Sequence, residues 1–256
     1  MSILSVRGLS RRFGGLKAVD DVSFDVLRGQ IKAVIGPNGA GKTTLFNLIS
    51  GYIEPDSGTT IFDGAEIQNC RPHEIAYKGI ARTFQHIRLF HGMSALENVM
   101  LGMHRLGSSG FISGMLGLPM VRREDRIARE RSMEALDFLG IAGLAGSDAT
   151  SLSFGQQRAV EMARALALEP TVLLLDEPAA GLNMHETAEL AELIVKIKEK
   201  GITVLIVEHD MSLVMKISDS VLVLSYGSKI AEDAPLAIQK NDEVVRIYLG
   251  GEDVNA

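Results

Sequence analysis

A glycine-rich segment with a single lysine gives the first indication of chemistry. Residues 36–43 read Gly-Pro-Asn-Gly-Ala-Gly-Lys-Thr and fit the pattern G-x-x-x-x-G-K-[ST] of phosphate-binding loops. The glycines allow backbone N–H groups to turn inward around an anion. Lys42 can reach the β- and γ-phosphates of a nucleotide, and the Thr43 hydroxyl can ligate Mg²⁺. The candidate nucleotide contacts are Gly36, Pro37, Asn38, Gly39, Ala40, Gly41, Lys42, Thr43 and Thr44.

A glycine-rich turn without a ligand is the alternative for this segment. The apolar run at 31–35 predicts a buried strand before it. The spacing of Leu45, Leu48 and Ile49 predicts a helix over 42–50, whose positive dipole end would point at the loop. Because a phosphate-binding loop needs a strand before it and a helix after it, we expect nucleotide binding.

Two adjacent acids follow another apolar run. Residues 171–175 predict a buried strand, and Asp176 and Glu177 come next. Buried strands of parallel sheets carry ligand-binding groups at their C-terminal ends. Asp176 is therefore expected to hold Mg²⁺, directly or through water, and Glu177 to polarise an attacking water. A strand that simply ends in a polar turn is the alternative. Two acids favour hydrolysis over switching, and the sequence lacks the guanine-reading pattern Asn-Lys-x-Asp.

Composition argues against several classes of protein. The 256 residues carry a net charge of −6 and 5% aromatic side chains, so we expect no nucleic-acid partner. The single cysteine, Cys70, excludes an internal disulfide and a cysteine-based zinc site, and it favours a reducing, cytoplasmic compartment. No apolar run reaches the roughly 20 residues that a membrane-spanning helix needs. Residues 110–121 come closest, but the run is short and interrupted by glycine and proline.

The pattern along the chain predicts an α/β protein with three parts. Alternating apolar residues predict a half-buried strand over 22–26, within an antiparallel N-terminal portion. Residues 87–168 read as mostly helical, with an irregular excursion or short broken helix at 102–119. The last third alternates strands and helices, which suits a parallel sheet covered on both faces. The clearest helices are expected at 94–101, 123–139 and 186–200, and further strands at 202–207 and 221–224.

A short segment before the two acids carries a family resemblance. Residues 152–157, Leu-Ser-Phe-Gly-Gln-Gln, resemble the Leu-Ser-Gly-Gly-Gln signature of ATP-binding cassette (ABC) proteins, with Phe154 at its variable third position. The resemblance implies ATP and Mg²⁺ as cofactors. It also implies that Ser153, Gly155 and Gln156 of one subunit close over the γ-phosphate bound by another. An ordinary helix start would explain the serine, but not the residues that surround it.

Other positions match functional residues of the ABC family in order. Gln85 matches the glutamine that approaches Mg²⁺ and the attacking water, and that links the site to the membrane part of a transporter. His209 matches the γ-phosphate histidine, although a lone histidine is more often structural. Phe13 matches the aromatic residue that stacks on adenine, with core packing as the alternative. Asn183 stands in the dimer-contacting loop, where Asp is commoner.

Taken together, the residues and the resemblance assign two sets of roles. The expected catalytic residues are Lys42, Gln85, Glu177 and His209, and the expected metal-site residues are Thr43, Gln85 and Asp176.

The resemblance covers the whole chain and is strongest to the ATP-binding subunits of bacterial branched-chain amino acid importers. Residues 82–90, 176–183 and 208–211 carry it, together with the excursion over 102–123. It implies one P-loop NTPase cassette over 1–256. Within that cassette, a RecA-like, mostly parallel sheet core would comprise 1–87 and 169–256, and a helical subdomain with the signature would comprise 88–168.

The implied function is ATP hydrolysis that powers the import of branched-chain or similar hydrophobic amino acids. The implied partners are a second ATPase subunit, identical or a sister, and integral membrane permease subunits on the cytoplasmic face of the membrane. A substrate-binding protein would take part indirectly. The ATPase of a lipid or lipopolysaccharide exporter is the alternative, because it would use the same site. A non-catalytic interaction module is disfavoured, because every expected catalytic position is filled.

Overall fold

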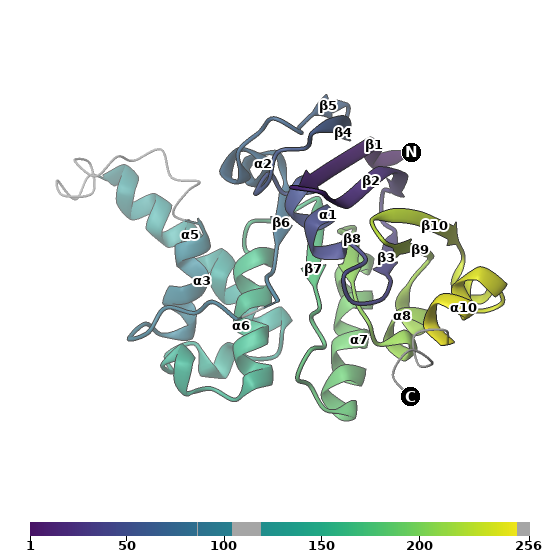
Figure 1. Ribbon diagram of the computed structural model, residues 1–256. Coiled ribbons are helices and arrows are strands. Elements are labelled where there is room, and N and C mark those ends of the chain that lie inside the picture. The colour runs from purple at the N-terminus through teal and green to yellow at the C-terminus, as the bar shows by residue number, and fades with distance from the viewer. Residues whose placement is uncertain (86, 104–118, 250–256) are drawn as a thin grey trace. The chain divides into compact units, whose positions relative to one another are not determined.

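The computed structural model describes residues 1–85, 87–103 and 119–249 (Figure 1). The chain divides into two compact units: Met1–Arg82 with Thr171–Ala256, and Thr83–Pro170. Residues 83–85, 87, 169 and 170, which are expected in the core from the sequence, fall in the second unit. For Phe84 and Gln85 the reason is local, since their backbone carbonyls accept hydrogen bonds from Arg158 of the second unit.

The first unit contains an antiparallel sheet of four strands in the order β2-β1-β4-β5. These strands are β1 (Ser2–Phe13), β2 (Leu16–Leu27), β4 (Ser57–Phe62) and β5 (Ala65–Glu66). In β2, Val22, Phe24 and Val26 are buried, while the residues between them are half-buried. The predicted alternation is thus confirmed, and it directs one face of this sheet into the core.

A six-stranded sheet in the order β10-β9-β3-β8-β7-β6 forms the centre of the first unit. Its first five strands along the chain, β3 to β9, run parallel to their neighbours in the sheet, and β10 pairs antiparallel at one edge. Every residue of β3, β7 and β8 is buried, as the continuous apolar runs predict for strands covered on both faces. The strands are β3 (Ile31–Ile35), β6 (Ile80–Arg82), β7 (Val172–Asp176), β8 (Thr203–Val207), β9 (Ser220–Ser225) and β10 (Ser228–Asp233).

Helices of the first unit cover this sheet and complete its core. Leu45 and Phe46 of α1 join one hydrophobic cluster with Leu205 and Leu222 of the parallel sheet and with Phe24 of the antiparallel sheet. Helix α7 contacts β8, and α9 contacts β9. The helices are α1 (Lys42–Ile49), α2 (Pro72–Lys78), α7 (Met184–Glu199), α8 (Met211–Ile217), α9 (Pro235–Gln239) and α10 (Asp242–Leu249).

The second unit is helical, as expected from its sequence. Helices α3 (Ala95–Met103), α5 (Pro119–Phe138) and α6 (Phe154–Leu166) contact one another, and two 3₁₀ turns, η1 (Ala142–Leu144) and η2 (Ala149–Ser151), lie between α5 and α6 in the chain. The expected excursion at 102–119 lies for the most part outside the described residues. Among the helices that the structure describes, none has the length and apolar character to span a bilayer.

Candidate functional site

The loop between β3 and α1 has a shape that only glycine allows at two positions. The φ angles of Gly36 and Gly41 are +153° and +97°. A Cβ at either position would lie 2.2 Å from a backbone carbonyl oxygen, that of Leu224 or Ala18. Gly41 is also the N-cap of α1, and none of the described side chains caps that helix. The first N–H groups of α1 therefore lack a side-chain acceptor and suit an anion.

Lys42 is buried against this loop. Its Nζ donates hydrogen bonds to the backbone oxygens of Gly36, at 2.6 Å, and Pro37, at 3.0 Å. Burial lowers the pKa of Lys42, while the nearby charges of Glu177 and Asp176 act in the opposite direction. The loop thus places an ammonium group close to the two acids that end β7.

Asp176, the last residue of β7, is a buried carboxylate whose two oxygens differ. Its Oδ2 accepts a hydrogen bond from Arg82 Nη2 at 2.8 Å, in an ion pair that is buried on both sides. Its Oδ1 is buried and has no hydrogen-bond partner. Arg82 also donates to Asn47 Oδ1 and Ser50 Oγ, at 2.8 and 2.7 Å, so this guanidinium joins β6, β7 and the end of α1.

Glu177 adopts a backbone conformation that side chains rarely take. Its φ is +47°, which costs about 1–3 kcal/mol for a residue other than glycine. Two hydrogen bonds hold the strained peptide: Glu177 N–H donates to Val207 O at 2.9 Å, and Ala180 N–H donates to Glu177 O at 3.1 Å. Strain of this kind is common at functional sites, where it aims a side chain that a relaxed backbone would not.

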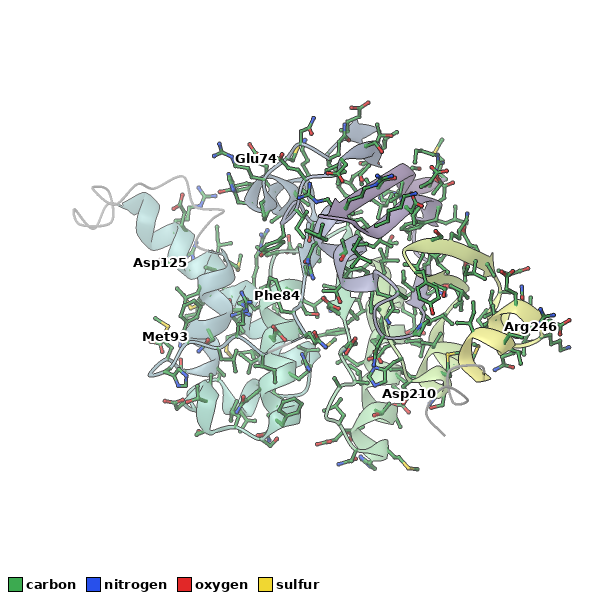
Figure 2. The ribbon with its side chains drawn as sticks, viewed as in Figure 1. Glu74, Phe84, Met93, Asp125, Asp210 and Arg246 are labelled. Carbon is green, nitrogen blue, oxygen red and sulfur yellow. The ribbon has the colours of Figure 1, made fainter. Side chains whose placement is uncertain are left out.

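His209 follows β8 and lies close to the carboxylate of Glu177. Its side chain is 61% exposed, and its Nδ1 lies 3.9 Å from Glu177 Oε2 and 3.7 Å from Glu208 Oε2. Asp210, the next residue, is labelled in Figure 2. It is the N-cap of α8 and accepts hydrogen bonds from Ser212 N and Leu213 N. The cap fixes where α8 begins, and Glu208 and His209 form the short segment between the end of β8 and this cap.

Phe13 ends β1 as an exposed aromatic residue. Its side chain is 46% exposed, so core packing, the alternative for this residue, is wrong. The guanidinium of Arg11 lies 5.2 Å from the ring centroid, within range of a cation–π contact. Stacking of Phe13 on adenine stays a prediction.

In the second unit, the signature segment begins a helix. Ser153 is the N-cap of α6, and its Oγ accepts a hydrogen bond from Gln156 N at 3.3 Å. Gln156 Oε1 accepts one in return from Ser153 N at 3.0 Å, which completes a capping box. An ordinary helix start, the alternative for this segment, is present, so Ser153 and Gln156 have a structural role beside their predicted one. Phe154, the departure from the family pattern, is 48% exposed.

Gln85 also belongs to the second unit, where a buried charge cluster of α6 holds its backbone. Arg158 donates to Phe84 O at 3.0 Å and to Gln85 O at 3.2 and 3.3 Å, and Glu161 accepts a hydrogen bond from Phe84 N at 3.4 Å. Phe84 is labelled in Figure 2. Burial raises the pKa of Glu161, and the charges of Arg158 and Arg164 oppose the rise.

The structure brings part of the predicted site together. Lys42, Asp176, Glu177 and His209 form one group in the first unit, through the charges and distances above. Gln85, Ser153, Gly155 and Gln156 lie in the second unit.

Arg82 and Glu208 are the residues at this site that sequence reasoning missed. Arg82 is 94 positions from Asp176, so no local spacing indicates their ion pair. Glu208 stands in the motif before His209, and only its burial in the structure draws attention to it.

A largely parallel sheet with a glycine loop at β3–α1 and acids at the end of β7 defines the class of P-loop nucleotide-binding proteins. Comparison with protein families narrows this class. The family model described as ABC transporter matches residues 19–180, and the chain belongs to that family.

Individual proteins agree with this membership. The chain is 45% identical over 249 residues to the high-affinity branched-chain amino acid transport ATP-binding protein BraF of Pseudomonas aeruginosa, covering 97% of this chain and 98% of BraF. LivG of Escherichia coli, which has the same description, is 43% identical with the same coverage. A crystal structure of the ADP conformation of an ABC transporter's ATP-binding cassette superimposes with a TM-score of 0.85 at 33% identity, covering 98% of this chain and 99% of that one.

Proposed function

We propose that this chain is the ATP-hydrolysing subunit of an ABC transporter that imports branched-chain or similar hydrophobic amino acids. The observation that supports ATP hydrolysis is that Lys42, buried on the glycine loop, lies close to Asp176 and Glu177. The substrate class is supported by BraF and LivG, whose descriptions name branched-chain amino acid transport and whose similarity extends over nearly the full chain.

The residues of the first unit fit Mg²⁺. Mg²⁺ takes oxygen ligands, usually one or two carboxylates together with phosphate oxygens and water. Asp176 Oδ1 is a buried carboxylate oxygen with no hydrogen-bond partner, and Arg82 keeps the other oxygen occupied. We assign Thr43 and Asp176 to the ion. The bound ion would neutralise charge that develops on the phosphates.

The remaining residues take roles that their placement supports. The loop glycines and the first turn of α1 hold the phosphates through backbone N–H groups, and Lys42 turns its ammonium from the loop carbonyls to the β- and γ-phosphates. Glu177 orients and polarises the attacking water, and His209, which follows the neighbouring parallel strand β8, donates to the γ-phosphate. Phe13 offers its exposed ring to the adenine.

The proposed transporter contains several other subunits. Ser153, Gly155 and Gln156 close on the nucleotide of a second ATPase subunit, either another copy or a sister chain. Integral membrane permease subunits receive the resulting motion, and the chain works peripherally on the cytoplasmic face of the membrane. Selection of the amino acid belongs to the permease and to a separate substrate-binding protein.

A lysine substitution tests the hydrolytic part of this proposal. In purified Lys42→Ala we expect weaker ATP binding and loss of Mg²⁺-dependent ATP hydrolysis, because the only charged side chain of the loop is removed. Lys240→Ala, at an exposed lysine after α9, is the matched control and should hydrolyse ATP like the parent. Hydrolysis by Lys42→Ala at the parent rate would refute the phosphate-loop assignment.

The transport part needs the membrane partners. The chain should co-purify from membranes with permease subunits, and vesicles rebuilt with the complex and its binding protein should accumulate labelled leucine, isoleucine or valine when ATP is supplied. If the same complex moves lipid or lipopolysaccharide and takes up no amino acid, the proposed import function is wrong and the exporter alternative is correct.

A further inference from the structure

Glu208 is a buried carboxylate with no function assigned above. It follows β8 and is 0% exposed, and its Oε2 lies 3.7 Å from Nδ1 of His209. Burial raises the pKa of Glu208, and backbone N–H donors from two loops oppose the rise. A carboxylate kept in the interior needs such partners, since burying an unpaired charge is expensive.

The two oxygens of Glu208 serve two different loops. Oε1 accepts a hydrogen bond from Ala179 N at 2.8 Å, and Oε2 accepts one from His209 N at 3.0 Å. Ala179 belongs to the loop after β7, and His209 to the loop after β8. One side chain therefore joins the backbones that carry the candidate base and the candidate γ-phosphate histidine.

Hydrogen bonds to the end of β8 flank Glu177 on both sides in the chain. Pro178 has no N–H, so Ala179 supplies the first backbone donor after Glu177. The N–H of Glu177 itself donates to Val207 O, the residue before Glu208. The strained Glu177 peptide is thus held on both sides by consecutive residues at the end of β8, once by backbone and once by the Glu208 carboxylate.

We propose that Glu208 is a positioning residue that fixes the Glu177 loop against the His209 loop, so that the two side chains face the same point of the bound nucleotide. This inference rests on the proposed function. Its chemical basis is that the backbone N–H groups of Ala179 and His209 each need an acceptor, and each receives one oxygen of the Glu208 carboxylate.

Glu208→Gln is the informative substitution, because it keeps shape and volume. One carboxylate oxygen becomes an NH₂ group, which faces an N–H donor and cannot accept its hydrogen bond. We expect kcat for ATP hydrolysis to fall about 10–100-fold, the effect of a misplacement of about 1 Å, while the KM for ATP stays within about twofold. Glu192→Gln, at an exposed carboxylate of α7, should match the parent in both constants.

Hydrogen–deuterium exchange provides the second measurement and needs no hydrolysis. In Glu208→Gln, backbone exchange should rise in the segments 177–183 and 208–210 and stay at the parent level in β3, β8 and α1. A fall in kcat with this local rise supports the inference. A parent-like kcat, unchanged exchange in the two segments, or a loss of ATP affinity with exchange raised throughout the first unit overturns it. If the parent itself does not hydrolyse ATP, the proposed function fails, and the exchange data alone decide the role of Glu208.

Discussion

Asp176 is a buried carboxylate with one oxygen in an ion pair and the other able to bind a metal ion. Arg82 binds Oδ2 and leaves Oδ1 without a hydrogen-bond partner. The guanidinium supplies the partner that a buried carboxylate needs, since burying an unpaired charge is costly. A carboxylate oxygen held at the end of a parallel strand is a suitable ligand for Mg²⁺. The ion pair therefore supports the site as well as the fold.

Removing Arg82 should destabilise the first unit strongly. Arg82→Met keeps much of the side-chain length but leaves the charge of Asp176 buried and unpaired. We expect a loss of about 3–5 kcal/mol in the free energy of unfolding, as for other broken buried ion pairs. Urea unfolding followed by circular dichroism gives this value. Arg12→Met, at an exposed arginine of β1, is the control and should change stability by less than about 0.5 kcal/mol.

The cause of this loss can be tested separately. If the unpaired charge is responsible, Arg82→Met combined with Asp176→Asn should be more stable than Arg82→Met alone, because the second change removes the buried charge. A double variant as unstable as the single one would assign the loss to the contacts of Arg82 with Asn47 and Ser50 instead.

At the scale of elements, the buried strands were easier to predict than the first residues of helices and the ion pairs between residues distant in the sequence. The apolar runs predict β3 at its observed bounds and β8 to within one residue, because burial on both faces leaves a continuous pattern. Helix α7 was expected from 186 and begins at Met184, since Asn183 accepts hydrogen bonds from His185 N and Glu186 N as its N-cap. The phosphate loop is local in sequence and was predictable. The pairing of Arg82 with Asp176 is not local, so it was not.

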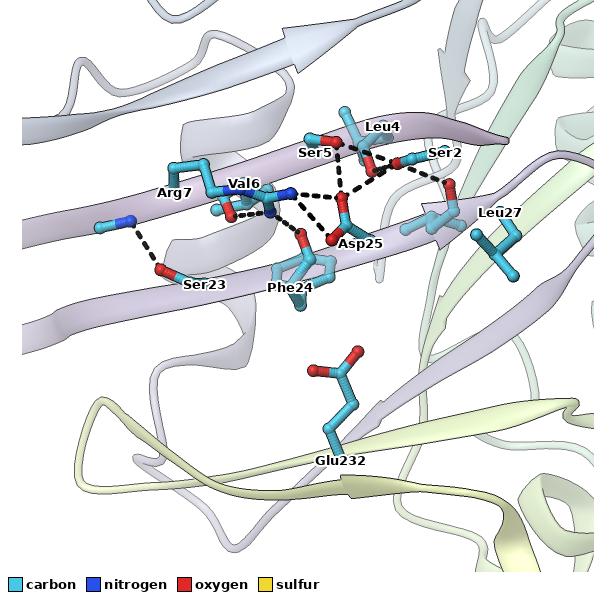
Figure 3. Close-up of polar contacts among 12 residues, drawn as sticks. Ser2, Leu4, Ser5, Val6, Arg7, Ser23, Phe24, Asp25, Leu27 and Glu232 are labelled. Atoms are coloured by element: carbon cyan, nitrogen blue, oxygen red, sulfur yellow. Dashed lines mark hydrogen bonds and ion pairs between the residues drawn. The ribbon is translucent and has the colours of Figure 1, made fainter.

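The β1–β2 pair carries a polar cluster that ties the N-terminal strand to its neighbour. Asp25 accepts hydrogen bonds from Ser5 Oγ at 2.6 Å, from Ser2 Oγ at 3.1 Å and from Arg7 Nη2 at 2.7 Å (Figure 3). Partial burial acts to raise the pKa of Asp25, but the hydrogen bonds from Ser5, Arg7 and Ser2 and the charge of Arg7 outweigh it and hold the pKa below its ordinary value.

This cluster predicts a pH-dependent difference in stability. A carboxylate with a lowered pKa in the folded state stabilises the fold above its unfolded pKa of about 4, and this contribution is lost as the pH falls through the folded value. Asp25→Asn should therefore be less stable than the parent at pH 7, by up to about 1 kcal/mol because the ion pair is largely exposed. The difference should shrink below about pH 4. A difference between urea midpoints that stays constant from pH 7 to pH 3 would contradict this assignment.

At the scale of the whole molecule, the candidate residues are divided between two units. Lys42, Asp176 and Glu177 belong to the first, and Ser153 and Gly155 to the second. The ABC resemblance implies that the signature residues of one chain act on the nucleotide of another. On that basis we propose that a single chain carries two halves of different sites and that closure needs two chains with ATP between them. Hydrolysis would then release the pair.

Blocking hydrolysis should consequently trap the dimer. Glu177→Gln retains shape and hydrogen bonding but loses the basic carboxylate, so ATP should still bind while the chemical step slows about 10²–10⁴-fold. With ATP and Mg²⁺, size-exclusion chromatography should show Glu177→Gln eluting at twice the mass of the parent, alone or with a sister ATPase if the natural pair is mixed. The double variant Lys42→Ala/Glu177→Gln should stay monomeric, because it lacks the lysine that holds the phosphates. Parent-like turnover by Glu177→Gln would assign the base elsewhere. An ATP-independent dimer would show that nucleotide does not join the chains.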